Sequence, residues 1–427
     1  MNGFMRWIEN KFVPVAGKIG SQRHLAAIRD GFVGIMPIVL AGSFAVLLNN
    51  TLGELVPAIG KVLGPINGNV WWGTLAMLGL LATFSIGYNL AKSYGEDGLS
   101  AGLISVASFI TTLPQAHGDA GWGYLHWGYL DANGLFTGII VALIATEIFV
   151  KLTKRGLTIK MPDTVPSAVG RAFASVLPGF IAIFLFGILT YIINAAELGS
   201  LYDIIFNLIQ KPLMGLTQGM IAVILIPIIM NFLWFLGVHG ANIFEPIMQS
   251  VYLPALTDNY NAIMAGEKAP HLITKAFFDS FVHLGGSGAT LALIVAIFIV
   301  VRKRKEYKEV AKLSLPLGIF QINESVIYGL PIVLNPILFI PFLIVPGVLT
   351  LVAYIATATG IVPPTYVQIP WITPVGIGAF LATGAKGIGS FMAALLAILN
   401  FVIAIIIYLP FVKAAEKQAI EREKVKS

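Results

Sequence analysis

The sequence predicts an all-α polytopic membrane protein with about ten transmembrane helices, two re-entrant hairpins and an N-terminal amphipathic helix. Only 11% of the 427 residues are charged and 57% are hydrophobic, whereas soluble domains carry about 25% charged residues. The mean hydropathy is +0.85, and the apolar residues form stretches of about 20, the length that crosses a bilayer. These observations exclude a soluble enzyme and a nucleic-acid-binding protein, despite a net charge of +6.

The first element is an amphipathic segment, and nine apolar stretches follow it. Residues 1–30 mix apolar and basic side chains without the apolar core of a signal peptide, so we expect a helix on the cytoplasmic membrane surface. The stretches that are long and apolar enough to cross the membrane are 31–49, 71–91, 99–116, 134–150, 172–195, 213–237, 284–301, 338–360 and 387–412.

The basic residues indicate how these stretches are oriented. Basic loops beside membrane helices stay in the cytoplasm, so we expect four basic clusters and both termini there. An even number of crossings must then separate successive clusters. The clusters hold 21 of the 27 basic residues: Arg6, Lys11, Lys18, Arg23 and Arg29; Lys151, Lys154, Arg155, Lys160 and Arg171; Arg302, Lys303, Arg304, Lys305, Lys308 and Lys312; Lys413, Lys417, Arg422, Lys424 and Lys426.

A tenth crossing follows from this parity. Only three apolar stretches separate the second and third clusters, so one crossing must be hidden within 238–286. We place it at 272–286. This segment carries Lys275, Asp279 and His283, which must face protein or a water-filled cavity rather than lipid.

Two further apolar stretches, 238–256 and 313–337, contain internal prolines. A helix does not run cleanly through such prolines, and irregular backbone at membrane depth must be buried in protein or line a cavity. We therefore predict two re-entrant hairpins. Because transporters bind substrate at broken helices, we assign 31–196 as a scaffold half, 197–212 as a connector and 213–412 as a transport half that holds the substrate site. Residues 413–427 form a basic cytoplasmic tail.

Five residues of the second half are candidates for substrate binding. Glu324 lies within the second broken stretch, beside Asn323, and its carboxylate can accept hydroxyl hydrogen bonds, as sugar recognition requires. His239 could hold a hydroxyl and accept its proton, and Asn242 offers both a donor and an acceptor. The indole of Trp371 could stack on a pyranose ring. The alternatives are a carboxylate that fixes the hairpin tip, a helix-end histidine and an interfacial tryptophan.

The sequence points to no chemistry beyond binding and proton transfer. There is no cysteine, so thiolate catalysis and cysteine-based metal sites are absent. There is also no P-loop, Rossmann fingerprint or G-x-S-x-G motif. We expect no cofactor and no metal, and no catalytic group beyond His239 or Glu324 as a proton acceptor. Glu245, Asp279 and His283 are weaker candidates, each either paired within the protein or in contact with substrate.

Four motifs resemble the enzyme IIC component of the phosphoenolpyruvate-dependent sugar phosphotransferase system, most closely the lactose/cellobiose family. They are GSFAVLLNN (42–50), FLGVHGAN (235–242), QINESVIYGLPIVLNP (321–336) and WITPVGIGAFLATG (371–384). The resemblance covers nearly the whole chain. It implies a homodimer in the bacterial plasma membrane, held together by the first five spans. It also implies that Glu324 and His239 line a disaccharide site with Trp371 nearby. The family motif is usually Asn-Glu-Pro, whereas Ser325 follows Glu324 here.

The function that this resemblance implies is that of a permease for a β-linked disaccharide of the cellobiose type. A phosphocysteine on a separate enzyme IIB protein, itself supplied by enzyme IIA, would phosphorylate the incoming sugar, which fits the missing cysteine. We expect the basic loop Arg302–Lys305 to help dock IIB. Diacetylchitobiose, lactose and longer β-glucans remain open as substrates. The alternatives are an ion-coupled secondary sugar transporter that uses Asp279 or Glu245, and a membrane enzyme acting on a lipid-linked sugar.

Overall fold

The computed structural model describes residues 18, 21–49, 56–118, 121–162, 164–236, 239–330, 332 and 336–426. Most of the predicted amphipathic segment 1–30 lies outside these residues, as do Arg6 and Lys11 of the first basic cluster. The described chain is almost entirely helical, in agreement with the predicted class, and a short hairpin of two strands is its only sheet.

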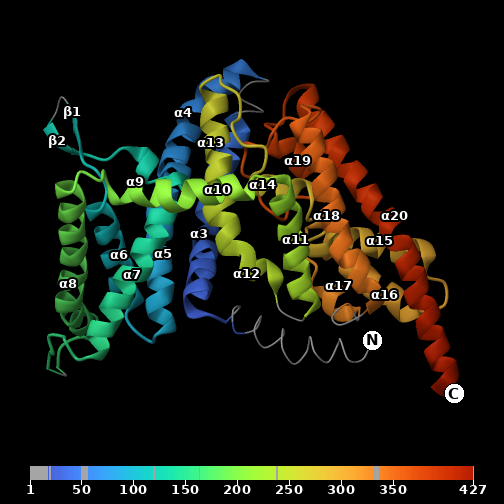
Figure 1. Cartoon of the computed structure of the whole chain (residues 1–427), viewed down its shortest axis with the longest axis horizontal. Coiled ribbons are helices and arrows are strands. Elements are labelled where there is room, and N and C mark those ends of the chain that lie inside the picture. Colours follow the sequence, from blue (N-terminus) through green and yellow to red (C-terminus); the bar gives the residue numbers. More distant parts are fainter. Residues whose placement is uncertain are drawn as a thin grey trace.

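The first half of the chain is a bundle of long helices, drawn in blue to green in Figure 1. Glycines allow these helices to approach closely: a Cβ on Gly87 of α5 would overlap Ser105 of α6, and a Cβ on Gly138 of α7 would overlap Thr83 of α5. The elements of this half are α3 (Arg23–Leu48), α4 (Pro57–Gly73), α5 (Leu78–Ser93), α6 (Gly98–Thr111), β1 (Ala116–Gly118), β2 (Gly121–Tyr124), α7 (Leu135–Lys154) and α8 (Ser167–Ala195).

A helical rod connects the two halves. It consists of α9 (Leu201–Ile205), the π-helical turn η6 (Phe206–Gln210) and α10 (Lys211–Thr217), and it crosses the molecule between the halves (Figure 1). Ser200 and Asp203 form a capping box that starts it. The chain then bends by 86° into α11 (Met220–Phe235). The predicted span 213–237 therefore begins later than expected, because its first residues belong to the rod.

The second half contains longer helices and several short ones. The short helices lie among the long ones, so backbone that leaves the regular helices remains enclosed by protein. The elements are α12 (Gly240–Ile247), η7 (Met248–Tyr252), α13 (Leu253–Met264), α14 (Lys275–Phe281), α15 (Thr290–Val300), α16 (Lys305–Ile319), α17 (Glu324–Gly329), α18 (Pro336–Ala358), α19 (Ile377–Ala382) and α20 (Gly387–Lys426).

The prediction of a hairpin at 238–256 is wrong. Helices α12, η7 and α13 follow one another with helical backbone at each junction, so Gly240–Met264 forms one helical rod. The π-helical turn relieves the clash that Pro254 would otherwise make with the preceding turn, and the Ser250 hydroxyl donates to the Pro246 carbonyl at 2.6 Å. At 1.5 Å per residue this rod is roughly 37 Å long, enough to cross a bilayer.

The prediction of a crossing at 272–286 is also wrong. Only Lys275–Phe281 is helical there, and seven residues span about 10 Å. The core of α14 is fully buried, with Ala276, Phe277 and Phe281 all 0% exposed. The charged residues of this segment pack within the protein and line a cavity, but the segment is a short inserted helix rather than a crossing.

The second broken stretch does reverse direction. Helix α16 ends at Ile319, the chain turns at Phe320–Asn323 with Gln321 at a φ of +66°, and α17 begins at Glu324. The two helices pack against each other. The stretch 313–337 thus contains a helix–turn–helix with Glu324 at its tip, and its re-entry into the membrane stays a prediction.

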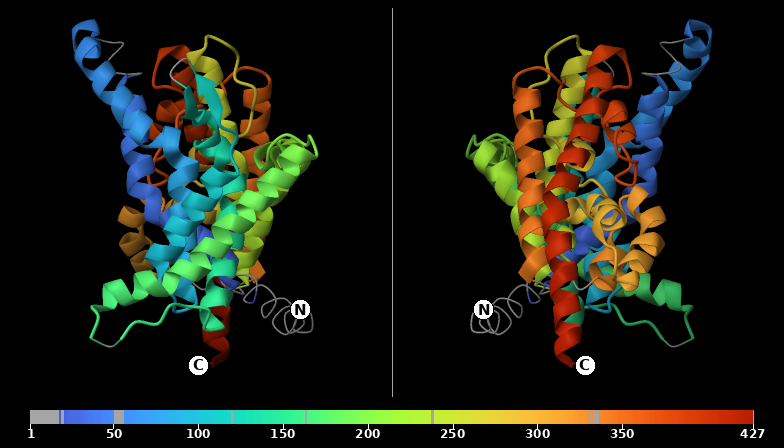
Figure 2. Two further views of the ribbon diagram at one scale, coloured as in Figure 1. Left: turned by 90° about the vertical axis from the view of Figure 1, so that its left-hand side faces the viewer. Right: turned by 90° about the vertical axis from the view of Figure 1, so that its right-hand side faces the viewer.

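Six helices in the described part of the chain are long and apolar enough to cross a membrane, or up to seven if the bent pair of α9–α10 and α11 counts as one span. Each of the nine apolar stretches found in the sequence contains a helix, although α6 and α15 are shorter than a full span. Figure 2 shows α20, the red helix, running from one end of the molecule to the other.

The basic clusters meet in pairs. The guanidinium carbon of Arg23 lies 3.9 Å from the centre of the Tyr94 ring, and the Lys154 ammonium lies 4.9 Å from the same ring. The Glu416 carboxylate accepts the backbone N–H groups of Arg302 and Lys303 at 2.8 and 2.6 Å. The first cluster thus adjoins the second, and the third adjoins the tail.

Candidate substrate site

A cavity of about 310 Å³ lies between the two halves. Its volume is at the lower end of the range of about 300–1,000 Å³ that is typical of small-molecule sites. One wall is the first half of α3, and the others come from α11, α12, α14, the tip of α17 and the loop at 368–371. All five predicted substrate-binding residues line it: His239, Asn242, Asn323, Glu324 and Trp371.

His239 caps the beginning of α12. Its Nδ1 accepts the backbone N–H of Asn242 at 3.1 Å, so the ring proton of the neutral imidazole resides on Nε2. Nε2 lies 3.6 Å from Oε1 of Glu324, slightly beyond hydrogen-bond distance. His239 is therefore a helix-end residue that also lines the cavity, and its contact with a sugar hydroxyl stays a prediction.

Glu324 is the first residue of α17, and its carboxylate is about half exposed, with 48% of the side chain accessible. Its Oε2 accepts the backbone N–H of Asn323 at 3.2 Å. A carboxylate in the first turn of a helix is favoured by the helix dipole. Ser325 occupies the second position of this helix, where the backbone N–H has no intrahelical acceptor. The helix therefore needs no N–H at this position, so its backbone would accept serine or the proline that is usual in the family motif.

Asn323 has a positioning role. Its side chain is buried, and its Nδ2 donates to the carbonyl of Ser287 at 2.9 Å. A Cβ on Gly286 would lie 2.7 Å from the Asn323 side chain. Asn323 therefore holds the tip of α17 against the 286–287 turn, which itself lines the cavity.

Gln321 is a functional candidate that the sequence did not single out. Its Oε1 accepts the backbone N–H groups of Gly285 and Gly286, and its Nε2 donates to the Thr373 carbonyl at 2.9 Å. It thus joins the α17 tip to the loop that carries Trp371. Its place in the QINES motif was a signal, but only the fold shows which segments it connects.

Two tryptophans contribute to the cavity. Trp371 is 42% exposed, so its ring surface is available for stacking. Trp234 of α11 was not predicted, because it lies within a continuous apolar stretch. It is 1% exposed, its ring centre is 4.0 Å from that of His239, and its Nε1 has no hydrogen-bond partner in the described chain.

The weaker candidates also line the cavity. The Lys275 ammonium donates to the Asp279 carboxylate at 2.9 Å, with both side chains at least 90% buried. Glu245 accepts a short hydrogen bond from the amide of Gln249, 2.5 Å away. His283 is half-buried and lines the cavity with them, and its Nδ1 is buried without a partner among the described residues. Lys275, Asp279 and Glu245 are thus paired within the protein and also line the cavity, whereas His283 lines it without a partner at Nδ1.

The wall formed by α3 was missed entirely. Phe32, Val33, Met36 and Val39 line the cavity from the half that was assigned as a scaffold. Their apolar sequence predicts only a membrane span. The site therefore lies on the seam between the halves rather than within the second half alone.

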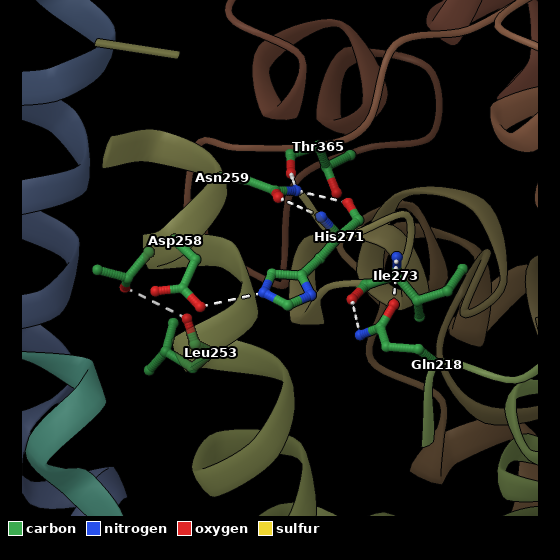
Figure 3. A network of polar contacts seen from close by, with 8 residues as sticks. Gln218, Leu253, Asp258, Asn259, His271, Ile273 and Thr365 are labelled. Atoms are coloured by element: carbon green, nitrogen blue, oxygen red, sulfur yellow. Dashed lines mark hydrogen bonds and ion pairs between the residues drawn. The ribbon is translucent and has the colours of Figure 1, made fainter. Parts of the chain in front are cut away.

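A polar network joins α13 to the segment before α14 and to the loop before Trp371 (Figure 3). The Asp258 carboxylate contacts His271 Nε2 at 3.0 Å, and the Asn259 amide donates to the carbonyls of His271 and Thr365 at 2.8 and 2.9 Å. Gln218, at the end of the connecting rod, exchanges two hydrogen bonds with the backbone of Ile273. These bonds fix the chain that leads into α14 and the loop that leads to Trp371.

Residues elsewhere have structural roles. Glu147 near the end of α7 pairs with His24 at 3.0 Å and Lys151 at 3.2 Å, as a structural residue would.

Within the described ranges, no group of three or more histidine, aspartate or glutamate side chains is arranged to hold a metal ion.

Comparison with known proteins gives consistent matches. Residues 29–346 match the family described as "Phosphotransferase system, EIIC". The chain is 37% identical to the lichenan permease IIC component of Bacillus subtilis, covering 99% of this chain and 96% of that protein. It is 35% identical to the cellobiose-specific EIIC component of Lactococcus lactis, with 98% and 99% covered. The crystal structure of the transporter ChbC, the IIC component of the N,N'-diacetylchitobiose-specific phosphotransferase system, superposes with a TM-score of 0.90 at 36% identity, covering 98% of this chain and 99% of that one.

Proposed function

The chain belongs to the EIIC family of the phosphotransferase system, and we propose that this permease carries a β-linked disaccharide of the cellobiose type for phosphorylation by a phosphorylated enzyme IIB partner. The similarity to the lichenan and cellobiose components supports the substrate class. Enzyme IIA would supply IIB. An ion-coupled transporter is not favoured, because the family couples uptake to phosphorylation and Asp279 is already paired with Lys275.

The observation that carries this proposal is the convergence of His239 and Glu324 in one cavity with Asn242 and Trp371. These residues come from three segments that lie far apart in the sequence. Together they offer a carboxylate and an amide for hydroxyl groups and an indole face for the ring. This combination suits a neutral, hydroxyl-rich ligand with an apolar ring face.

The geometry favours Glu324 over His239 as the proton acceptor. Nδ1 of His239 is occupied by the Asn242 N–H, and Nε2 carries the remaining ring proton toward Glu324. In the transfer, the S–P bond of the IIB phosphocysteine breaks and an O–P bond to the sugar hydroxyl forms. The hydroxyl proton passes to the Glu324 carboxylate, while His239 orients that carboxylate.

The ten crossings remain part of the proposal, with one reassignment. We propose that α3, α5, α6, α7, α8, α11, α12–α13, α15, α18 and α20 cross the membrane. The rod α12–α13 replaces 272–286 as the crossing between the second and third basic clusters. The α14 region and the α16–α17 pair are then the two elements that enter the membrane without crossing it. This arrangement keeps all basic clusters, and both termini, on the cytoplasmic side.

The assignments of halves and partners follow from this topology. The first five crossings form the scaffold and the homodimer interface, which the exposed apolar face of α8 supports, with Phe180, Phe184 and Ile188 each more than half exposed. The remaining crossings form the transport half. IIB docks at the basic loop Arg302–Lys305, which leads into α16 and thus toward the Glu324 tip.

Binding of a labelled sugar panel to purified protein and a Glu324→Gln variant tests the proposal. Hydrogen bonds to a charged group contribute about 1.5–3 kcal/mol, so we expect cellobiose affinity to fall roughly 10- to 100-fold. Glu309→Gln, on the exposed face of α16, is the control and should bind normally. Unchanged cellobiose binding by Glu324→Gln would refute the site. A preference for lactose or diacetylchitobiose in the panel would reassign the substrate.

A further inference from the structure

A second, much smaller pocket lies on the same seam, above the cavity. Its volume is about 30 Å³, the share of liquid volume that one water molecule occupies. One side comes from α3, α4 and the turn before α7, and the other from α13 and residues 366–368. Gln368 lines both this pocket and the main cavity, so the two adjoin, and a path between them would pass Gln368.

The pocket lies toward the end of the molecule opposite the basic clusters. Helices α13 and α4 lie in the upper part of Figure 1, whereas α20 ends at the bottom. With the orientation proposed above, the path from the cavity through Gln368 leads to the external face. The small volume means that this path is closed in the present conformation.

Aromatic rings from both halves close it. The centre of the Trp71 ring lies 6.3 Å from that of Tyr260 and 5.4 Å from that of Trp127. Trp71 and Tyr260 also pack against one apolar cluster in which Val46 of α3 meets Tyr366 and Val367. Trp71 belongs to the first half and Tyr260 to the second, so a separation of the halves would part these rings.

The pocket also contains polar atoms without partners. Asp131 is 1% exposed, and its Oδ2 has no hydrogen-bond partner in the described chain. The Oε1 of Gln368 also lacks a partner there. A buried polar group without a partner costs about 1–3 kcal/mol. Here two such groups and two aromatic faces surround one path, which is the combination of groups that recognises a sugar.

We propose that this seam is an outer subsite for the disaccharide. Trp71 and Tyr260 stack on the pyranose faces and Asp131 and Gln368 take hydroxyl groups as the sugar passes to the main cavity. The rings then close behind it. This inference rests on the proposed function, because it assumes that the cavity binds a sugar which arrives from outside.

Trp71→Ala separates the outer subsite from the main cavity, which Trp71 does not line. In intact cells, kcat/KM for uptake of labelled cellobiose should fall roughly three- to tenfold, the loss expected for one aromatic stacking contact. Equilibrium binding to the purified variant should stay within about twofold of the parent. The matched control is Trp72→Ala, because Trp72 is 50% exposed and lines neither pocket.

Other outcomes are also decisive. Uptake by Trp71→Ala that equals or exceeds that of the parent would show that the ring only obstructs the path, and would overturn the subsite. Loss of binding by the purified variant would assign Trp71 to the main site or to folding, which also overturns it. Tyr260→Ala should reproduce the uptake defect, and Tyr260→Phe, which keeps the ring, should not. Failure of the proposed function is recognised separately, by unchanged binding in Glu324→Gln.

Discussion

His239 shows how one side chain serves both the fold and the site. Its Nδ1 caps α12, and this same bond fixes the tautomer that presents Nε2–H toward Glu324. The residue types of this pair could be selected from the sequence, because ionisable groups at membrane depth point to function. Which of the two is free to accept a proton could not be inferred from the sequence, because it depends on which atom accepts a single backbone N–H.

Asp131 carries a prediction about pH. Burial raises the pKa of its carboxyl to about 7, well above the ordinary range of an aspartate, with the nearby Asp258 charge adding to the effect of burial. The folded protein therefore binds the proton more tightly than the unfolded chain. Below about pH 4 the Asp131 carboxyl is protonated in both states and does not reduce the free energy of unfolding. As the pH rises through 7, it reduces the free energy of unfolding by up to about 4 kcal/mol.

Asp131→Asn removes this cost, because the amide is neutral at every pH and retains an oxygen for the Asn133 N–H, which Oδ1 accepts at 2.7 Å. The melting temperature of the purified variant should exceed that of the parent at pH 8, and the difference should vanish toward pH 4. Asp30→Asn, at an exposed ion pair with Arg29, should show no such trend. A constant difference between Asp131→Asn and the parent at both pH values would contradict the argument.

The helical elements show where sequence rules succeed and fail. Apolar length located a helix in each of the nine predicted spans, since burial in lipid requires it. The proline rule placed a hairpin at 238–256, but a π-helical turn and the Ser250 hydroxyl accommodate the prolines within a continuous rod. In the second stretch Pro316 lies inside α16, which continues to Ile319, and the chain turns at Phe320–Asn323, where there is no proline. Whether a helix accommodates a proline depends on the local backbone geometry, which the presence of prolines in the sequence does not show.

Gly240 determines how closely α12 begins against α11. A Cβ at this position would overlap the carbonyl oxygen of Met230, so one helix must shift in Gly240→Ala. We expect a loss of about 1–3 kcal/mol, seen as a lower melting temperature. Sugar affinity should fall as well, because His239 directly precedes Gly240. Gly215→Ala is the matched control: no atom lies within 4 Å of its added Cβ in α10, so the helix should be unchanged or slightly more stable. Equal melting temperatures for the two variants would show that α12 is free to move.

At the scale of the whole molecule, the site belongs to the seam rather than to either half. Proline-containing stretches and ionisable residues in the sequence pointed to one side of the cavity, because such residues are unusual at membrane depth. The α3 side consists of ordinary apolar residues, and only the fold shows that Phe32 and Met36 face the cavity. The same limit explains why Trp71 and Tyr260, which meet across the seam, were not predicted as a pair.

If the halves separate during transport, a link across the seam must stop uptake. Val46 and Val367 lie in one buried cluster, on opposite sides of the seam. The chain has no native cysteine, so Val46→Cys with Val367→Cys introduces the only two thiols. A short, reducible bifunctional thiol reagent should abolish cellobiose uptake in this variant, and a reductant should restore it. Binding to the purified, linked protein should persist, since the main cavity is not altered. Val367→Cys with Ala382→Cys is the control within one half, where the Val367 N–H donates to the Ala382 carbonyl at 3.0 Å. If the linked seam still supported uptake, the outer path would not open between these elements, and the sugar would have to reach the cavity by another route.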